Sequence, residues 1–203
     1  MLLILLLSHL LTLKQVNWAD YPYCPDTKVR VTCTNDYLIL SWKVREQNVR
    51  GTITNDQGPT YTDSAVEFFC LMPDGKHYTN FEFNCLGYCL SDIQTDMPDK
   101  NRLTRSAEEM ALIKRKTSLG HDSIGVIEGV TRWKLRATIP LRYFLDESCW
   151  DEHGKLRRGT SIQCNFYKCA DGSPTPHYVS WSEIKTPRPN FHTPGYFQKL
   201  RIK

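Results

Sequence analysis

The sequence lacks low-complexity tracts and internal repeats, and no stretch of it is strongly basic. Hydrophobic residues make up 40% of the 203 residues, so a packed core is expected and intrinsic disorder is not. The net charge of +4 comes from 26 Lys and Arg scattered among 22 Asp and Glu, and the densest basic cluster, Lys114–Lys116, is short. This pattern argues against nucleic-acid binding.

Recognisable catalytic and cofactor motifs are missing as well. The chain has no nucleophile elbow, no nucleotide-binding loop and no metal motif. It contains no C-x-x-C, and the spacings Cys85–Cys89 and Cys164–Cys169 are loose for zinc and lack an H-x-H partner. No Asp-rich loop specifies calcium. We therefore expect no cofactor, no metal site and no catalytic residue.

Eight cysteines form an even set, which together with an export signal would favour disulfides. However, Cys70, Cys85 and Cys164 fall within expected strands, where cysteine commonly serves as a small buried hydrophobe. We expect the thiols to be mostly reduced or only partly paired.

The first residues, 1–13, are nearly all apolar, but the run is short for a bilayer span. Two interpretations stay open: a secretory signal, or an apolar N-terminal helix packed on the domain. A basic n-region is missing, and no A-x-A site precedes Tyr21. We expect an apolar leader over 1–15, a single domain over 16–203, and a secreted, periplasmic or cell-envelope location.

A predicted β-hairpin over residues 60–87 organises the rest of the chain. Glu67 alternates with apolar neighbours in the run AVEFFC, which is a period of two that suits a pleated strand. Pro73-Asp74-Gly75 then supplies a turn. The second strand, 77–86, carries a polar face of Tyr78, Asn80, Glu82 and Asn84. Carboxylates and amides beside aromatic rings suit a neutral polyhydroxylated ligand.

The remaining pattern predicts short strands with little helix. A capping box at Ser106–Glu109 opens one short helix that we expect to run through Lys116. Residues 48–58 read as a loop, and Trp42 as a core residue. Alternating or β-branched runs predict strands over 28–34, 37–44, 131–138, 161–169, 177–181 and 197–202. The fold class expected is all-β: an antiparallel, jelly-roll-like β-sandwich with one short helix.

Several motifs in fixed order then resemble one known family. They are VNW at 16–18, DSAVEFF at 63–69, NFEFNCLG at 80–87, NFYKC at 165–169, PHYVSW at 176–181 and PNFH at 189–192. Over about residues 16–202 the chain resembles the family 9 carbohydrate-binding modules of bacteria. The resemblance implies a β-sandwich that binds a mono- or oligosaccharide without cleaving it, in relatives attached to polysaccharide-degrading enzymes.

The resemblance also implies a site in which two aromatic rings hold a terminal sugar and polar groups bond to its hydroxyls. The first ring falls at Tyr61, where relatives commonly carry tryptophan; the second is assigned to Trp181, with Tyr167 in reserve. Glu67 either faces the ligand or pairs with a base such as Lys168. The polar groups expected to share one groove with these rings are Asp63, Glu67, Asn84, Arg102, Asn165 and Lys168.

Two other function classes compete with sugar binding. Glu67 and Glu82 could act as the acid pair of a glycoside hydrolase, which must flank the scissile bond. Met72 and His77 could act as axial ligands in a haem-binding redox sandwich, although such a pocket needs a large apolar lining. Because the family motifs extend along the chain, non-catalytic carbohydrate binding is the preferred hypothesis.

Overall fold

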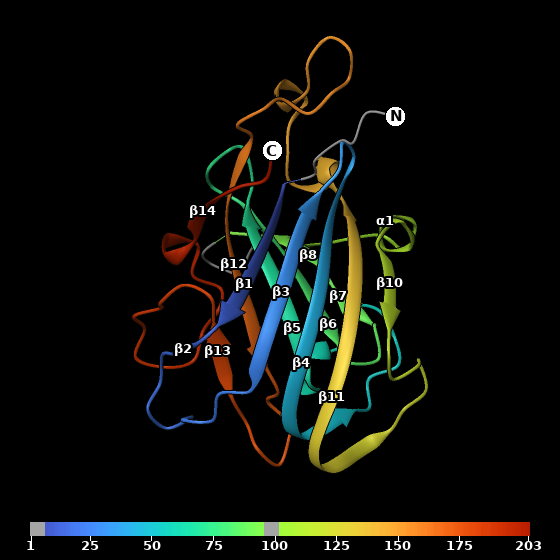
Figure 1. Ribbon diagram of the computed structural model, residues 1–203, viewed down its shortest axis with the longest axis vertical. Helices are drawn as coiled ribbons and strands as arrows, with labels where there is room; N and C mark the ends of the chain where they lie inside the picture. Colours follow the sequence, from blue (N-terminus) through green and yellow to red (C-terminus); the bar gives the residue numbers. More distant parts are fainter. Residues whose placement is uncertain (1–6, 96–101) are drawn as a thin grey trace.

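The computed structural model describes residues 7–95 and 102–203 and consists of two antiparallel β-sheets packed face to face (Figure 1). This confirms the expected all-β sandwich with one short helix. In the first sheet, strands β3 and β4 alternate buried and more exposed side chains, as a sheet with one wet face requires. In the second sheet, β5 and β6 are buried along nearly their whole length, because loops also cover part of the outer face.

The first sheet contains five strands and is built around two long, paired strands. β4 and β11 pair from Tyr37↔Pro140 to Gly51↔Gly125, with a bulge between Ile127 and Val130. The order across this sheet is β1 (Ser8–Leu13), β3 (Asp26–Cys33), β4 (Tyr37–Gly51), β11 (Gly125–Pro140) and β10 (Lys114–Thr117).

The second sheet carries the predicted hairpin at its centre, and every strand pairing in it is antiparallel. The order along it is β2 (Gln15–Val16), β13 (Tyr178–Ser180), β12 (Ser161–Cys169), β5 (Ala65–Leu71), β6 (Tyr78–Asn84), β8 (Asp92–Gln94) and β9 (Leu103–Thr104). In addition, β14 (Gln198–Arg201) pairs with β12, and β7 (Cys89–Leu90) pairs with β6.

The core fills the space between the two sheets. Trp42 and Trp133 from the first sheet are almost fully buried and meet aromatic residues of the second, such as Phe166, whose ring centroid lies 5.9 Å from that of Trp42. Burial of these large rings is the main favourable term in the stability of such a fold. The prediction that Trp42 is a core residue is confirmed.

The outer face of the second sheet is partly covered by loops. A smaller apolar cluster there joins Phe69 and Tyr167 of the sheet to Trp18 near the N-terminus and to Phe191 and Phe197 of the C-terminal loops. Because these loops cover only part of the face, room remains beside them. Short 3₁₀ turns complete the chain at Thr60–Thr62, Leu141–Tyr143, Glu147–Cys149 and Pro194–Tyr196.

Three local predictions differ from the structure. The loop predicted over 48–58 begins only after Gly51, because residues 48–51 continue β4 in its pairing with β11. Helix α1 (Ala107–Leu112) has the predicted capping box between Ser106 and Glu109, but it ends well before Lys116. The basic residues that follow belong to β10, because β11 offers them a strand edge to pair with. Likewise Ser8–Leu13 forms strand β1 rather than a helix, and it pairs with β3 along six residues. Cleavage of residues 1–15 as one unit would therefore remove β1.

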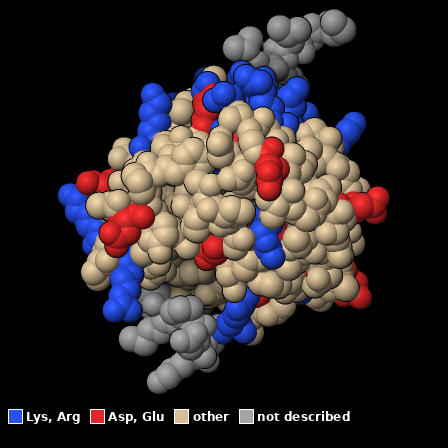
Figure 2. Space-filling model, turned by 90° about the horizontal axis from the view of Figure 1, so that it is seen from below, with Lys and Arg blue, Asp and Glu red and all other residues tan. Residues whose placement is uncertain are grey.

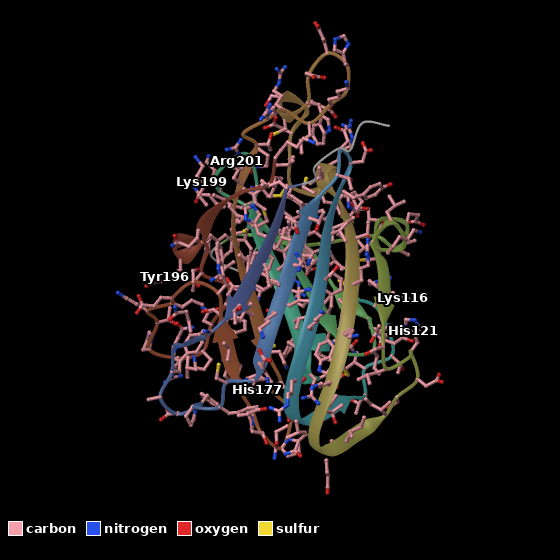
Figure 3. The ribbon with its side chains drawn as sticks, in the orientation of Figure 1. Lys116, His121, His177, Tyr196, Lys199 and Arg201 are labelled. Atoms are coloured by element: carbon pink, nitrogen blue, oxygen red, sulfur yellow. The ribbon has the colours of Figure 1, made fainter. Side chains whose placement is uncertain are left out.

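Charged side chains are spread over the surface. Lys116 lies at one edge of the molecule, and Lys199 and Arg201 lie at the other (Figure 3). The face seen in Figure 2 is largely covered by uncharged residues, with both signs of charge around it.

All eight cysteine thiols are free, and six of these residues are buried. Within residues 7–95 and 102–203, no helix has the length and apolar character needed to cross a membrane.

Candidate carbohydrate-binding site

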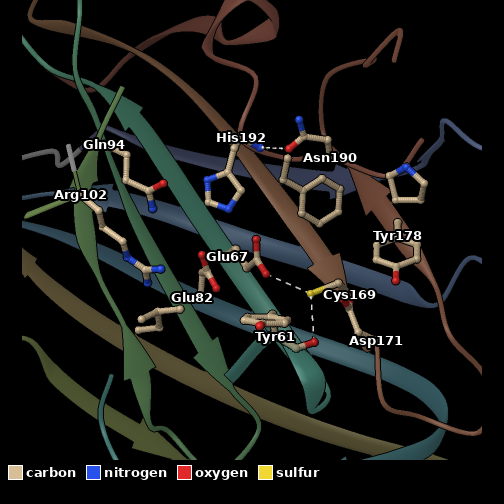
Figure 4. Close-up of a pocket in the computed structure, with 13 residues that line it drawn as sticks. Tyr61, Glu67, Glu82, Gln94, Arg102, Cys169, Asp171, Tyr178, Asn190 and His192 are labelled. Carbon is tan, nitrogen blue, oxygen red and sulfur yellow. Dashed lines mark hydrogen bonds between the residues drawn. The ribbon is translucent and has the colours of Figure 1, made fainter. Parts of the chain in front are cut away.

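A pocket of about 540 Å³ opens on the outer face of the second sheet, beside the covering C-terminal loop (Figure 4). Its floor comes from the central strands, and its walls come from the loops that enter and leave them. The lining residues are Tyr61, Glu67, Glu82, Leu90, Gln94, Arg102, Cys169, Asp171, Tyr178, Pro189, Asn190, Phe191 and His192. The volume lies within the range of pockets that bind small organic ligands.

Two carboxylates, Glu67 and Glu82, lie side by side on the pocket floor. They are direct partners in the pairing of β5 with β6, so both side chains project from the same face. Glu67 accepts a hydrogen bond from the Cys169 thiol at 3.0 Å, and Glu82 accepts one from the Asn80 amide at 2.7 Å. Their exposed fractions are only 2% and 3%. Such groups are costly to bury in ionised form.

The electrostatics of the floor follow from this burial. Loss of solvent, and then the neighbouring Glu82 carboxylate, raise the pKa of Glu67 well above its ordinary value. Burial also raises the pKa of Glu82 to about 7, against the opposing hydrogen bond from Asn80. Near neutral pH these two groups therefore hold a proton that an exposed pair would have released.

Aromatic and polar groups form the wall on the β12–β13 side. Tyr61, placed by the 3₁₀ turn Thr60–Thr62, remains 40% exposed and lies near the floor carboxylates in Figure 4. Tyr178 stands farther along the pocket beside Asp171, to which its hydroxyl is hydrogen-bonded. Burial raises the pKa of Asp171 to about 6. This wall offers apolar ring surface together with a carboxylate.

The opposite wall carries the cationic side chain of the pocket. Arg102 lines it and forms an ion pair with Asp92, which is fully buried; the Arg102 Nε atom lies 2.6 Å from Asp92 Oδ2. His192 lies above the floor, and its Nδ1 is 2.8 Å from the hydroxyl of Tyr78. Burial, and then the nearby Arg102, lower the pKa of His192 to about 4. His192 is therefore neutral near pH 7.

The structure brings three of the expected site residues together in this pocket, namely Tyr61, Glu67 and Arg102. The expectation of one shared groove is wrong for the other five. Asp63 and Asn84 instead brace a neighbouring loop. Asp63 is fully buried and accepts hydrogen bonds from the backbone N–H groups of Thr52 and Ile53, and Asn84 donates to Asp63 at 2.9 Å.

Asn165 and Trp181 also have structural partners. The Asn165 side chain accepts a hydrogen bond from the Ser182 backbone N–H and donates to the Ser182 carbonyl, which fastens the chain after β13. Trp181 packs on the core side against Phe166, with ring centroids 5.8 Å apart. The reserve residue Tyr167 is fully buried and stacked on Phe191 at 4.2 Å. None of these three lines the pocket.

Lys168 faces away from the pocket, into the space between the sheets. Its ammonium lies 2.9 Å from Glu46 Oε2, and both side chains are fully buried. The expected alternative of a Lys168–Glu67 salt bridge is therefore wrong, because alternation along β12 turns Lys168 and Cys169 to opposite faces.

The haem ligands proposed from the sequence do not line the pocket either. His77 forms an ion pair with Asp74 in the turn between β5 and β6, and Met72 packs against the sandwich core at the end of β5. Within the described residues, no three His, Cys, Asp or Glu side chains are grouped so as to hold a metal ion.

Several residues that line the pocket were not among the site residues predicted from the sequence. Tyr178 and His192 lie within the motifs that carried the family resemblance, and that position was the signal available for them. Asp171 and Asn190 come from loops without any periodic pattern. Glu82 was placed on the polar face of the hairpin and considered as half of a hydrolase pair, but it was not among the predicted sugar-binding residues.

Comparisons with known proteins concern the family and the fold of the chain. No curated protein matches the sequence significantly. A structure from Bacteroides uniformis, of a protein suggested to bind carbohydrate, is 35% identical with a TM-score of 0.86, covering 96% of this chain and 86% of that one.

Structures of a family 9 carbohydrate-binding module from Caldicellulosiruptor kristjanssonii share the fold. The glucose complex has 13% identity and a TM-score of 0.53, covering 95% of this chain and 84% of that one. The cellotriose complex has 12% identity and a TM-score of 0.55, covering 94% and 80%. The profile of carbohydrate-binding family 9 matches residues 5–202. The match spans almost the whole sequence, and the chain therefore belongs to carbohydrate-binding family 9.

Proposed function

We propose that this protein binds a saccharide end or a short oligosaccharide, without cleaving it, in the pocket over β5 and β6. One observation carries the proposal: an exposed ring, Tyr61, stands at the same pocket as two buried carboxylates, Glu67 and Glu82. A sugar presents an apolar C–H face and a rim of hydroxyls, so it needs both kinds of surface.

Each part of the pocket has a chemical role in this proposal. The ring of Tyr61 offers its face to the C–H surface of a pyranose. Glu67, Glu82 and Asp171 accept hydrogen bonds from hydroxyls, and Arg102 donates to hydroxyl or ring oxygens. Buried polar groups of this kind reject ligands that leave them unpaired, which favours polyhydroxylated molecules over apolar ones.

The arrangement of the two floor carboxylates supports binding rather than hydrolysis. A glycosidase places its two acids on either side of the scissile bond. Here Glu67 and Glu82 occupy paired positions of neighbouring strands and project from one floor. A sugar above them would meet both carboxylates from the same side. We therefore expect no release of reducing sugar on incubation with oligosaccharides.

We further propose that the protein serves polysaccharide catabolism in a bacterium, outside the cytoplasm, together with polysaccharide-degrading enzymes. Family membership and the saccharides bound by the Caldicellulosiruptor modules support this context. Cell fractionation and co-purification from cells grown on a polysaccharide test it.

The direct test of the proposed function is isothermal calorimetry with gluco- and xylo-oligosaccharides and their monosaccharides. We expect saturable binding that falls about ten-fold or more in Tyr61→Ala, since an aromatic contact is worth about 0.5–1.5 kcal/mol beyond its buried area. Tyr37→Ala is a matched control, because Tyr37 is similarly exposed, at 43%, but lies on β4 in the other sheet. Absence of binding to every saccharide would refute the proposal.

A further inference from the structure

Acidic side chains outnumber Lys and Arg among the described residues that line the pocket. Three carboxylates line it, from Glu67, Glu82 and Asp171, against a single basic side chain among the described lining residues, Arg102. That cation is already committed to the buried Asp92 carboxylate. Once this ion pair is set aside, the other described lining groups that can carry a full charge near neutral pH are the three acids.

The floor carboxylates are also poorly compensated by the protein itself. Glu67 Oε1 accepts one hydrogen bond, from a thiol, and Glu82 Oε1 accepts one from the Asn80 amide. Among the described residues no donor contacts the second oxygen of either carboxyl, although an ionised carboxylate accepts up to about four hydrogen bonds. Two adjacent, nearly buried acids thus keep acceptor capacity that faces the pocket.

The nearest lysine does not supply the missing positive charge. Lys168 follows Tyr167, the strand partner of Glu67, but its side chain turns to the other face of β12 and pairs with Glu46. Burial and Arg102 lower the pKa of His192, which keeps this residue neutral near pH 7. Among the described residues no Lys or Arg forms an ion pair with Glu67 or Glu82, so a cation that enters the pocket would be a direct partner for their ionised forms.

We infer that this pocket selects sugars that carry a free amino group, with the ammonium held over Glu67 and Glu82, in preference to the corresponding neutral sugars. The inference rests on the proposed function and specifies the class of its ligand. An ammonium has three donors and a positive charge, so it can bond to both carboxylates at once and offset their repulsion. A hydroxyl at the same position gives one donor and no charge.

Comparing glucosamine with N-acetylglucosamine isolates the contribution of the free amino group. The acetyl group removes the positive charge and replaces an ammonium with a single amide N–H, while the rest of the sugar ring is unchanged. It also adds bulk above a floor that is closed by the loop carrying Asn190 and His192. The order of affinity expected is therefore glucosamine first, then glucose, then N-acetylglucosamine.

Calorimetric titration of the wild-type protein with these three monosaccharides at about pH 7 and low salt tests the inference. We expect glucosamine to bind about ten-fold more tightly than glucose, the effect of a charge-assisted contact in a partly desolvated pocket. Because this comparison needs no variant, it is independent of any effect of a substitution on folding.

Two variants test whether Glu82 causes the preference for glucosamine. Glu82→Gln keeps the size of the side chain and its hydrogen bond from Asn80, and it should bring the glucosamine-to-glucose affinity ratio close to one. The matched control is Glu128→Gln, an exposed carboxylate on β11 that should leave the ratio unchanged. Thermal melts of both variants confirm that they are folded.

The possible results distinguish a failure of the amino-sugar inference from a failure of the proposed saccharide binding. Binding of glucose with equal or weaker binding of glucosamine overturns the amino-sugar inference and leaves saccharide binding intact. A glucosamine preference that survives Glu82→Gln overturns the placement of the ammonium over the floor. Failure of every neutral and amino saccharide to bind overturns both proposals.

Discussion

The two faces of strand β12 handle buried charge in opposite ways. On the inner face, Lys168 meets Glu46 at 2.9 Å, and the indole N–H of Trp133 donates to the other Glu46 oxygen at 2.6 Å. On the outer face, one residue later, Cys169 gives Glu67 only a thiol hydrogen bond. Both carboxylates are almost inaccessible to solvent, yet only the inner one has a cationic partner.

The presence or absence of a cationic partner distinguishes a structural carboxylate, Glu46, from the carboxylates of the proposed binding site. Glu46 lies on β4 and Lys168 on β12, so their ion pair links the two sheets and is complete without a ligand. Glu67 and Glu82 have acceptor capacity to spare and face a pocket. Where a buried carboxylate has a cationic partner in the protein, breaking the pair should affect stability. Where it has none and faces a pocket, its removal should affect ligand binding.

The largest expected effect comes from breaking the inner pair. Lys168→Met removes the cation and leaves Glu46 buried and uncompensated, which should lower the free energy of unfolding by about 3–5 kcal/mol. Urea unfolding monitored by tryptophan fluorescence measures this change. Saccharide affinity, measured below the unfolding transition, should remain within about two-fold because Lys168 faces away from the pocket.

A second substitution sharpens this prediction. Adding Glu46→Gln to Lys168→Met removes the orphaned charge, while the amide oxygen of the new side chain can still accept the hydrogen bond from Trp133. Much of the lost stability should therefore return. If the double variant is as unstable as the single one, packing rather than charge explains the loss, and the contrast between the two faces weakens.

The next effect concerns the outer carboxylates and pH. Glu82 has a pKa of about 7 in the folded protein, against 4.5 ordinarily, so the native state binds more protons than the unfolded state between these values. The contribution of Glu82 to stability is therefore fully present below pH 4.5 and is lost as pH rises through 7. At about 1.4 kcal/mol per unit, the full loss is of the order of 3 kcal/mol.

Comparison with Glu82→Gln isolates this contribution. The charged groups around Glu82 that remain in both proteins are Glu67, Asp92, Arg102 and Asp171. Burial lowers the folded pKa values of His177 and His192, which therefore act with the opposite sign in both proteins. Denaturation from about pH 4.5 to 8 should show the wild type losing stability relative to the variant. Parallel stability curves would mean that Glu82 ionises normally and that the floor is not under electrostatic strain.

The sequence was most informative where side-chain periodicity decides the outcome. The alternation in the 65–71 strand correctly placed Glu67 on the polar face. In β12 the same rule puts Asn165 and Tyr167 on one face and Phe166 and Lys168 on the other. Applied there, it would have predicted that Lys168 points inward. The failure at Lys168 was therefore avoidable, because a period of two leaves no freedom in assigning faces.

Other errors could not be avoided by pattern alone. An asparagine that braces a loop and one that bonds to a sugar have the same side chain, and Asn84 became a brace because Asp63 and the Ile53 carbonyl lie within its reach. Asp171 and Asn190 reach the pocket through loops whose paths depend on tertiary packing. Strand periodicity gives no information about such residues.

The smallest predicted effect concerns Tyr61, the exposed ring that lines the pocket together with the acidic floor. An indole offers a larger face to a pyranose than the phenol ring of Tyr61 does. Tyr61→Trp should tighten saccharide binding by about three-fold in calorimetry, since the added apolar contact is worth well under about 1.5 kcal/mol. Tyr37→Trp, the same change at the comparably exposed tyrosine of the other sheet, should leave affinity unchanged. Weaker binding by Tyr61→Trp would mean that the pocket is fitted to the smaller ring. The carboxylate floor, rather than aromatic stacking, would then dominate recognition in this protein.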